Sequence, residues 1–226
     1  MPTEPTPAAT RPLMPGLLPE EVAPVYRRVA PVYDVWARLT EHRARARCLE
    51  LADVHDGESV LEVAVGTGLL FEQLVRRNPR GRTEGIDLTD GMLAIARAKV
   101  RGLPGKHRLA LGDARCLDFE DRSFNLLVNN YMFDLLPEDT FAPVLSEFRR
   151  VLRPTGRMVL VNLARSDALP SRIWESLYRI APRLVGGCRG VSLARTVADA
   201  GFVVEREERL SQLGMPSEIL LARRRA

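Results

Sequence analysis

The sequence predicts an α/β protein in which helices cover both faces of a mostly parallel β-sheet. From residue 55 onward, short apolar runs alternate with segments whose apolar residues recur at helical spacing. The runs lack strict alternation between apolar and polar residues, as expected for strands that are buried on both faces. The first run ends in a glycine-containing turn, which is typical of the strand-to-helix turns in such sheets.

Seven segments are expected to form strands. Five of them alternate with helices along the chain, at 59–65, 82–87, 107–112, 124–130 and 156–163. Two more lie near the C-terminus, at 201–207 and 217–223. We expect these last two to pair antiparallel, because the segment between them is shorter than the dozen or more residues that a parallel crossover needs.

The segments between and before the strands have apolar residues at helical spacing, which predicts that they form helices. Helices are expected at 41–52, 69–77, 90–100, 143–152, 171–180 and 191–200. Residues 20–54, which Pro24 and Pro31 divide into short pieces, are expected to form a helical cap on a core at 55–226. Residues 1–19 are rich in proline, which blocks helix and sheet hydrogen bonding, so we expect a flexible tail followed by one domain at 20–226.

Composition argues against several classes of protein. The 33 basic and 29 acidic residues are interspersed, so the formal charge of +4 does not form the basic patch of a nucleic-acid-binding protein. Cys48, Cys116 and Cys188 are isolated from one another, which fits neither a disulfide framework nor a zinc site. The sequence has neither a secretory leader nor an apolar run long enough to span a membrane, and we therefore expect a cytoplasmic protein.

Gly66 and Gly68 lie on the predicted turn after the first strand, in the segment VLEVAVGTG. Glycines at such a turn allow a ligand to approach the backbone. A dinucleotide-binding turn would have a third glycine in the pattern GxGxxG, but Phe71 occupies that position. This departure counts against NAD, although a GxG pattern alone is also compatible with an ordinary tight turn.

Acidic residues end the next two predicted strands. Asp87, in GIDLTDGM, could accept hydrogen bonds from the two hydroxyls of a ribose, or it could cap the following helix. Thr89 and Asp90 are better placed for the capping role. Asp113, in GDARCLDF, could accept from the amino group of adenine, with the amide of Ala114 facing a ring nitrogen. These strand ends together indicate an adenosine-like ligand.

These segments resemble the class I S-adenosylmethionine-dependent methyltransferases, particularly the ubiquinone and menaquinone biosynthesis branch. The resemblance spans roughly residues 26–223 and is carried by VLEVAVGTG, GIDLTDGML, GDARCLDFEDRSFN, LRPTGRMVLVN and RRVAPVYDVW. It implies a Rossmann-like fold with a seven-stranded, mostly parallel sheet, an antiparallel final strand inserted near one edge, and helices on both faces. Ala64 and Asn125 stand where the family often has Gly and Asp.

The resemblance also implies S-adenosylmethionine as the methyl donor and S-adenosylhomocysteine as the product. In the family, the glycine turn lies against the methionine part of the cofactor, the second acidic position binds the ribose and the third meets the adenine. The residues expected to bind the cofactor are therefore Tyr26, Tyr33, Glu62, Ala64, Gly66, Gly68, Asp87, Leu88, Met92, Asp113, Ala114, Asn129 and Asn130.

Methyl transfer from a sulfonium mainly requires that the nucleophile and the methyl carbon be held in line, about 3 to 3.5 Å apart. A dedicated catalytic residue is therefore not required, although a phenol or acidic carbon as acceptor would benefit from a base. The candidates for such a role are Tyr33, Asn130, Tyr131 and His42. His42 lies among arginines on what we expect to be a solvated helix face, and the tyrosines could instead pack on the sheet.

Three functional hypotheses remain open at this point. The first is a methyltransferase with a small-molecule or lipid-like acceptor of the quinol, phenol or amine class. The second is a nicotinamide-dependent oxidoreductase, which Phe71 and the lack of a Tyr-x-x-x-Lys pair disfavour. The third is a non-catalytic protein that retains the fold. The apolar and basic residues of 165–189 are compatible with weak membrane association, and a homodimer is also compatible with the sequence.

Overall fold

The structure is a computed structural model that describes residues 40–165 and 189–225. Several features expected from the sequence lie outside these residues. They are the tail at 1–19, Tyr26, Tyr33, Cys188, the helix at 171–180, and nearly all of the stretch at 165–189.

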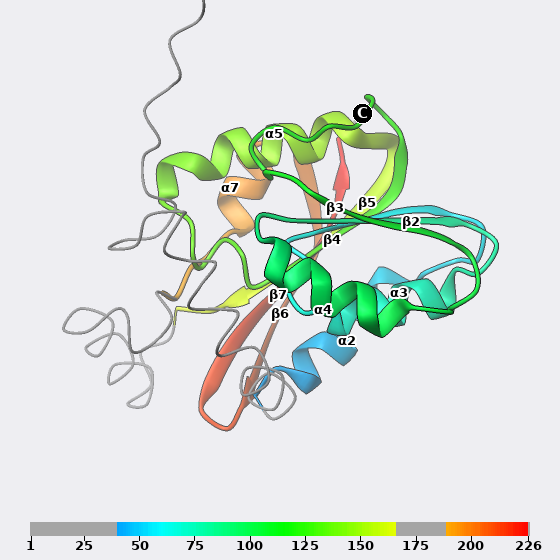
Figure 1. Cartoon of the computed structure of the whole chain (residues 1–226). Helices are drawn as coiled ribbons and strands as arrows, with labels where there is room; N and C mark the ends of the chain where they lie inside the picture. The colour runs from blue at the N-terminus through cyan, green and yellow to red at the C-terminus, as the bar shows by residue number, and fades with distance from the viewer. Residues whose placement is uncertain (1–39, 166–188, 226) are drawn as a thin grey trace, which may run out of the picture.

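One seven-stranded sheet, with the strand order β3-β2-β1-β4-β5-β7-β6, forms the centre of the molecule (Figure 1). The strands are β1 (Ser59–Val63), β2 (Arg82–Asp87), β3 (Lys106–Leu111), β4 (Phe124–Asn130), β5 (Leu152–Leu163), β6 (Phe202–Gln212) and β7 (Met215–Arg224). The strands from β3 to β5 in this order pair in parallel, whereas β7 is antiparallel to both β5 and β6. This confirms the expected mostly parallel sheet with its final strand inserted antiparallel near one edge.

Helices cover both faces of the sheet (Figure 1). The helices are α2 (His42–Ala52), α3 (Leu69–Arg77), α4 (Asp90–Val100), α5 (Phe141–Val151) and α7 (Ala194–Asp199), with the 3-10 turn η1 (Glu138–Thr140) before α5. α5 and α7 pack on one face, where Phe148 and Val197 join the largest core cluster. α2, α3 and α4 lie on the other face, where Cys48 and Leu74 join a second cluster. The buried residues of α5 recur every three or four positions, so the helix presents one apolar stripe to the sheet.

Two of the predicted element boundaries were displaced for identifiable reasons. The helix predicted at 191–200 begins only at Ala194, because Val191 forms a β-bridge with Ala164 and Leu193 donates its backbone N–H to Glu218. The strand predicted at 156–163 begins earlier, at Leu152, which pairs with Phe124. Pro154 and Gly156 obscured this start, since both residues are unfavourable in a strand interior.

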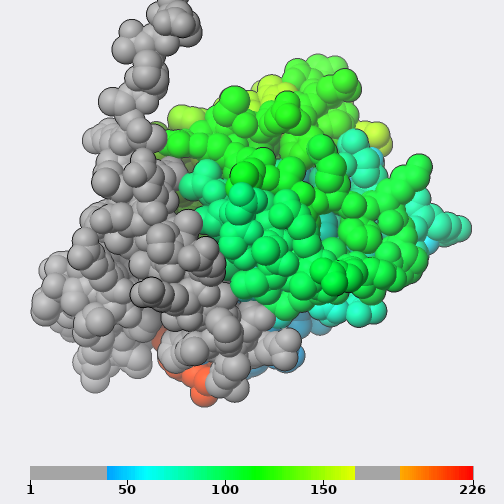
Figure 2. Space-filling view, in the orientation of Figure 1, coloured from blue at the N-terminus to red at the C-terminus, as the bar shows by residue number. Residues whose placement is uncertain are grey.

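The β6–β7 hairpin is longer than the sequence predicted. Its strands pair as far as Gln212 and Met215, so that only Leu213 and Gly214 connect them. Both connecting residues have a positive φ, 51° and 81°, which is the conformation that a two-residue turn of the type I′ class needs. Leu-Gly lacks the Asn or Asp that usually signals this turn, which is why the sequence did not reveal it. The orange tip of the hairpin is visible at the bottom of Figure 2.

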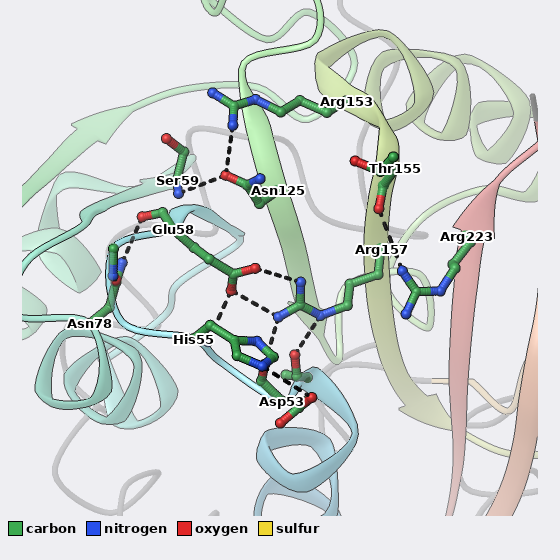
Figure 3. A network of polar contacts seen from close by, with 12 residues as sticks. Asp53, His55, Glu58, Ser59, Asn78, Asn125, Arg153, Thr155, Arg157 and Arg223 are labelled. Carbon is green, nitrogen blue, oxygen red and sulfur yellow. Dashed lines mark hydrogen bonds and ion pairs between the residues drawn. The ribbon is translucent and has the colours of Figure 1, made fainter.

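Arg157 of β5 fixes the C-terminal end of α2 over the sheet (Figure 3). Its guanidinium donates hydrogen bonds of 2.7 Å to the carbonyl oxygens of both Ala52 and Asp53, and it forms a two-bond ion pair with Glu58 at 2.8 Å. The last carbonyls of a helix have no intrahelical partners, so Arg157 supplies bonds that this end of α2 would otherwise lack.

The parallel strands bring their carboxyl ends to one edge of the sheet. β2 and β3 lie on one side of β1, whereas β4 and β5 lie on its other side. The order of the strands in the sheet therefore reverses between β1 and β4. Ligands in open α/β sheets bind outside the carboxyl ends of the strands at such a switch point. A ligand-binding site is therefore expected at the segments that follow β1, β2 and β4. Among the described residues, no helix combines the length and apolarity needed to cross a membrane.

Candidate functional site

The chain leaves β1 through a turn in which Ala64, Gly66 and Gly68 all have positive φ angles, of 59°, 55° and 83°. A Cβ atom on Gly66 would meet nothing within 4 Å, so this part of the backbone is open to an approaching ligand. A Cβ atom on Gly68 would lie 2.8 Å from the Cβ of Ala96. Gly66 thus borders open space, whereas Gly68 is needed for the close packing of the turn against α4.

Phe71 occupies the position of the third glycine of a dinucleotide-binding turn, and its side chain is fully buried. Its ring packs over Gly85 of β2, where an added Cβ would lie 2.7 Å from a ring carbon of Phe71. The close contact between helix and strand is therefore made by a glycine on the strand and a large residue on the helix. In a dinucleotide-binding turn the third glycine allows this close contact. Phe71 stands in its place here, which is the departure from GxGxxG that the sequence shows.

Asp87 holds the glycine turn through its carboxylate. Oδ2 accepts a hydrogen bond of 2.7 Å from the backbone of Gly66, and Oδ1 accepts from the backbone and the hydroxyl of Thr89 at 2.9 and 2.8 Å. Thr89 is the N-cap residue of α4, as its position in the sequence suggested, but its side chain makes no capping hydrogen bond. Burial raises the pKa of Asp87, and these hydrogen bonds oppose the shift. The backbone of Leu88 also stabilises the charged carboxylate, so the protein itself supplies donors to most of the about four acceptor positions of Asp87.

Asp113 follows β3 and forms an ion pair with Arg115, whose guanidinium lies 2.6 Å from Oδ2. Burial favours the neutral carboxyl, but the hydrogen bonds and charge of Arg115 outweigh it and hold the pKa of Asp113 below its usual value. An adenine at this position would therefore share Asp113 with Arg115. Of the neighbouring candidates, Leu88 is exposed, Met92 is buried in α4, and Ala114 packs against the largest core cluster.

A cavity of about 60 Å³ lies where the glycine turn, the end of β4 and the start of α2 meet. It is lined by Glu41, Arg45, Glu62, Ala64, Val65, Gly66, Thr67, Leu69, Leu70, Asn130 and Tyr131. Five residues that the sequence singled out are thus brought together, namely Glu62, Ala64, Gly66, Asn130 and Tyr131. Among the residues described, no group of His, Cys, Asp or Glu side chains is arranged to hold a metal ion.

Asn129 and His42 are among the candidates that do not line this cavity. Asn129 is fully buried, and its side-chain amide donates a 2.8 Å hydrogen bond to the carbonyl of Val63, which ties β4 to β1. His42 is exposed and borders a separate groove of about 560 Å³ between α2 and α3. The structure therefore does not place the imidazole of His42 among the side chains around the glycine turn.

Glu62 contributes a buried carboxylate to the cavity. It is 2% exposed, and its Oε2 has no hydrogen-bond partner among the described residues. Burial, followed by the charge of Asp87, raises the pKa of Glu62 well above its usual value, while Arg45 opposes the shift. Because a buried polar atom without a partner is costly, this oxygen is suited to a polar ligand group that enters the cavity.

Glu41 and Arg45, which the sequence motifs did not single out, enter the cavity from the start of α2. Nη1 of Arg45 lies 3.8 Å from Oε2 of Glu41, and the two side chains are only 13% and 10% exposed. Burial raises the pKa of Glu41 to about 7, Arg45 opposes this shift and Asp134 adds to it. The signal in the sequence is an acid–base pair four residues apart beside the buried stripe of Ala44 and Cys48.

Tyr131 is the first residue after β4 and has a φ of 54°, a conformation that is uncommon for a residue other than glycine. Its hydroxyl lies 2.8 Å from the hydroxyl of Ser217. Burial, and next the charge of Glu41, raise the pKa of Tyr131, so its hydroxyl stays protonated at neutral pH. Tyr131 is therefore suited to hydrogen bonding rather than to the role of a base. Strained backbone of this kind is concentrated at functional sites.

Comparisons with known proteins bear on the chemistry of this site. A family model described as a methyltransferase domain matches residues 60–156. The chain is 32% identical over 207 residues to the phosphatidylethanolamine N-methyltransferase of Cereibacter sphaeroides, covering 91% of this chain and 98% of that protein. It is 30% identical over 171 residues to the demethylmenaquinone methyltransferase of Lactobacillus johnsonii, covering 72% of this chain and 69% of that protein.

Solved structures share the fold of this chain. The [4+2]-cyclase SpnF superposes with a TM-score of 0.73 at 18% identity, covering 94% of this chain and 99% of the cyclase. At this level of identity the likeness concerns the fold alone, and the reaction has to be argued from the residues of the site.

Proposed function

Because this chain belongs to the class I S-adenosylmethionine-dependent methyltransferases, we propose that it transfers a methyl group to a lipid-like acceptor that carries an amine. The observation that carries the proposal is the cavity in which the open backbone of Gly66 meets Glu62 of β1, Tyr131 directly after β4 and Glu41 directly before α2. The backbone of Gly66 and the carboxyl group of Glu62 suit the methyl donor, whereas Tyr131 and Glu41 suit a nitrogen acceptor.

The residues around the strand ends fit the donor. The partnerless oxygen of Glu62, next to the open backbone at Gly66, suits the charged amino group of the methionine end. We assign the ribose to Asp87, whose carboxylate lies at the end of β2 and contacts the glycine turn. We assign adenine to Asp113, together with Ala114. When bound, S-adenosylmethionine supplies a methyl group on a positively charged sulfur, which is already activated for transfer.

Glu41 supports an amine as the acceptor. An amine in water is largely an ammonium, which must lose a proton before its nitrogen can attack a methyl carbon. A carboxyl with a pKa of about 7 suits such a proton transfer at neutral pH, because it is both available as a base and able to release the proton later. Glu41 would take this proton while the neutral hydroxyl of Tyr131 orients the acceptor by hydrogen bonding.

The relatives support two acceptor classes. The C. sphaeroides protein, which this chain matches over nearly its whole length, methylates a phospholipid amine according to its name. A quinol ring is the second candidate, since the L. johnsonii protein is a demethylmenaquinone methyltransferase. The carboxyl of Glu41 favours the amine, because an amine acceptor must lose a proton before it attacks and a carboxyl with a pKa of about 7 can accept that proton.

Transfer of labelled methyl groups from S-adenosylmethionine tests the proposal. The full chain is mixed with phosphatidylethanolamine vesicles, demethylmenaquinol, or small amines and phenols. We expect label in the phospholipid, with a rate that rises through about pH 7 and loses this rise in Glu41→Gln. Glu50→Gln, at an exposed position of the same helix, serves as the matched control and should retain the wild-type pH profile.

The alternative outcomes separate the hypotheses. Label in the quinol with none in the phospholipid would overturn the amine proposal in favour of the second candidate. Binding of S-adenosylhomocysteine without transfer to any acceptor of the panel would speak for a non-catalytic protein that retains the fold.

A further inference from the structure

We propose that Arg45 binds the carboxylate of the methionine end of the cofactor, which makes α2 a wall of the cofactor site. This inference rests on the proposed function and assigns a role to a residue that lies outside the strand-end motifs. Three observations support it: Arg45 lines the cavity beside the glycine turn, its ion pair with Glu41 is loose, and acidic side chains line the same cavity.

Arg45 reaches the same space as the glycine turn. It lines the 60 Å³ cavity together with Gly66 and Thr67, although it comes from a helix that precedes β1 in the chain. It is the only basic residue among the described residues that line this cavity. With its side chain 13% exposed, Arg45 is largely withdrawn from bulk water, where its charge acts more strongly on a ligand.

The ion pair of Arg45 contrasts with that of another buried arginine in the same chain. Arg157 holds Glu58 at 2.8 Å through two hydrogen bonds and also binds two carbonyl oxygens. Arg45 lies 3.8 Å from Glu41, which is longer than a hydrogen bond. A guanidinium presents five donors in a planar fork that matches a carboxylate. The loose pair with Glu41 therefore suits a guanidinium that receives a carboxylate from a ligand.

The charges around the cavity are complementary to an amino acid. Arg45 opposes the rise in the pKa of both Glu62 and Glu41, so its charge acts on both carboxyl groups that line the cavity. The methionine end of the cofactor carries one carboxylate and one ammonium on the same carbon atom. Arg45 can bind the carboxylate while Glu62 binds the ammonium.

Calorimetric titration with two ligands that differ only in the carboxylate tests the inference. S-adenosylmethionine and decarboxylated S-adenosylmethionine are each titrated into the full chain without an acceptor. We expect Arg45→Met to weaken binding of S-adenosylmethionine by about 10- to 100-fold, since hydrogen bonds to a charged group are lost. Binding of the decarboxylated ligand should change by less than about threefold, because it lacks the group that Arg45 would contact.

Two further variants keep the test decisive. Arg43→Met removes the same charge from an exposed position of the same helix and should leave both affinities unchanged. Arg45→Lys retains the charge but loses the planar fork, so it should fall between wild type and Arg45→Met for S-adenosylmethionine only. It also provides the comparison if Arg45→Met fails to fold, which thermal unfolding would reveal.

Equal losses for the two ligands would overturn the inference, because they would indicate a purely structural role for Arg45. Unchanged affinity for S-adenosylmethionine would overturn it as well, while leaving the proposed function intact. If the wild-type chain bound neither ligand, the proposed function itself would fail, and this inference with it.

Discussion

Asp87 ties the end of β2 to the glycine turn that follows β1. Its carboxylate accepts a hydrogen bond from the backbone N–H of Gly66, which lies 21 residues earlier in the chain. The sequence placed Asp87 correctly at a strand end, because an acidic residue after an apolar run is a local pattern. The contact with Gly66 could not be predicted, since it depends on how two neighbouring strands are aligned.

Glu41 should make the stability of the protein depend on pH. Its pKa is raised from 4.5 to about 7 in the folded chain, so its contribution to stability is fully present below pH 4.5 and is lost as the pH rises through about 7. We therefore expect Glu41→Gln to gain stability over wild type between these values and to keep the gain at higher pH. The difference corresponds to about 3 kcal/mol, at 1.36 kcal/mol for each pKa unit.

Urea unfolding of wild type and Glu41→Gln at pH values from 4 to 8.5 measures this difference in the free energy of unfolding. Glu50→Gln, at an exposed position of α2, should differ from wild type by the same small amount throughout. A difference between Glu41→Gln and wild type that does not change with pH would contradict the burial of an ionisable Glu41.

At the scale of elements, α2 carries residues of the candidate site at one end and is fixed to the sheet at the other. Glu41 and Arg45 lie at its start, and Arg157 binds the carbonyl oxygens at its end (Figure 3). A second ion pair joins the helix to the β6–β7 hairpin, where Arg47 lies 2.7 Å from Glu208. These contacts are long-range, so the sequence predicted the helix but not which of its charged residues turn toward the strand ends.

Arg157→Met should loosen this attachment. The change removes the hydrogen bonds to two carbonyl oxygens and leaves Glu58, whose side chain is 16% exposed, without its cationic partner. Breaking a buried pair from one side costs about 3 to 5 kcal/mol. For a domain of this size, we expect the melting temperature in a calorimetric scan to fall by about 6 to 20 °C.

Arg153→Met is the matched control for this experiment. Arg153 lies on the same strand and makes a 3.1 Å hydrogen bond to Asn125 at the surface. Its loss should lower the melting temperature by only a few degrees, as is usual for exposed polar contacts. Equal effects of the two substitutions would show that the network around Arg157 contributes no more than a surface contact.

At the scale of the whole molecule, the sequence was most informative where local pattern and topology agree. Apolar runs between helical segments predicted the parallel strands, and the meeting of their carboxyl ends at one edge then followed. The insertion of β7 between β5 and β6 came from the family resemblance, because spacing alone predicted only an antiparallel pair. The cavity was not predicted, since it also needs α2, whose position depends on packing between distant segments.

The same fold supports other reactions, as its likeness to a [4+2]-cyclase illustrates. The central claim is therefore about the ligand, namely that S-adenosylmethionine binds at the carboxyl ends of β1, β2 and β3. Asp87 is the residue through which this claim can be tested most directly, because it contacts the glycine turn and is the residue to which we assign the ribose.

The decisive measurement is calorimetric titration of the full chain and of Asp87→Asn with S-adenosylhomocysteine. We predict binding to wild type at one site and binding at least about tenfold weaker to Asp87→Asn, because one charged acceptor is lost. The circular dichroism spectrum of the variant should remain that of wild type, and NADH should produce no binding heat with either protein. Absence of binding to wild type at millimolar S-adenosylhomocysteine, or equal binding to both proteins, would contradict the account.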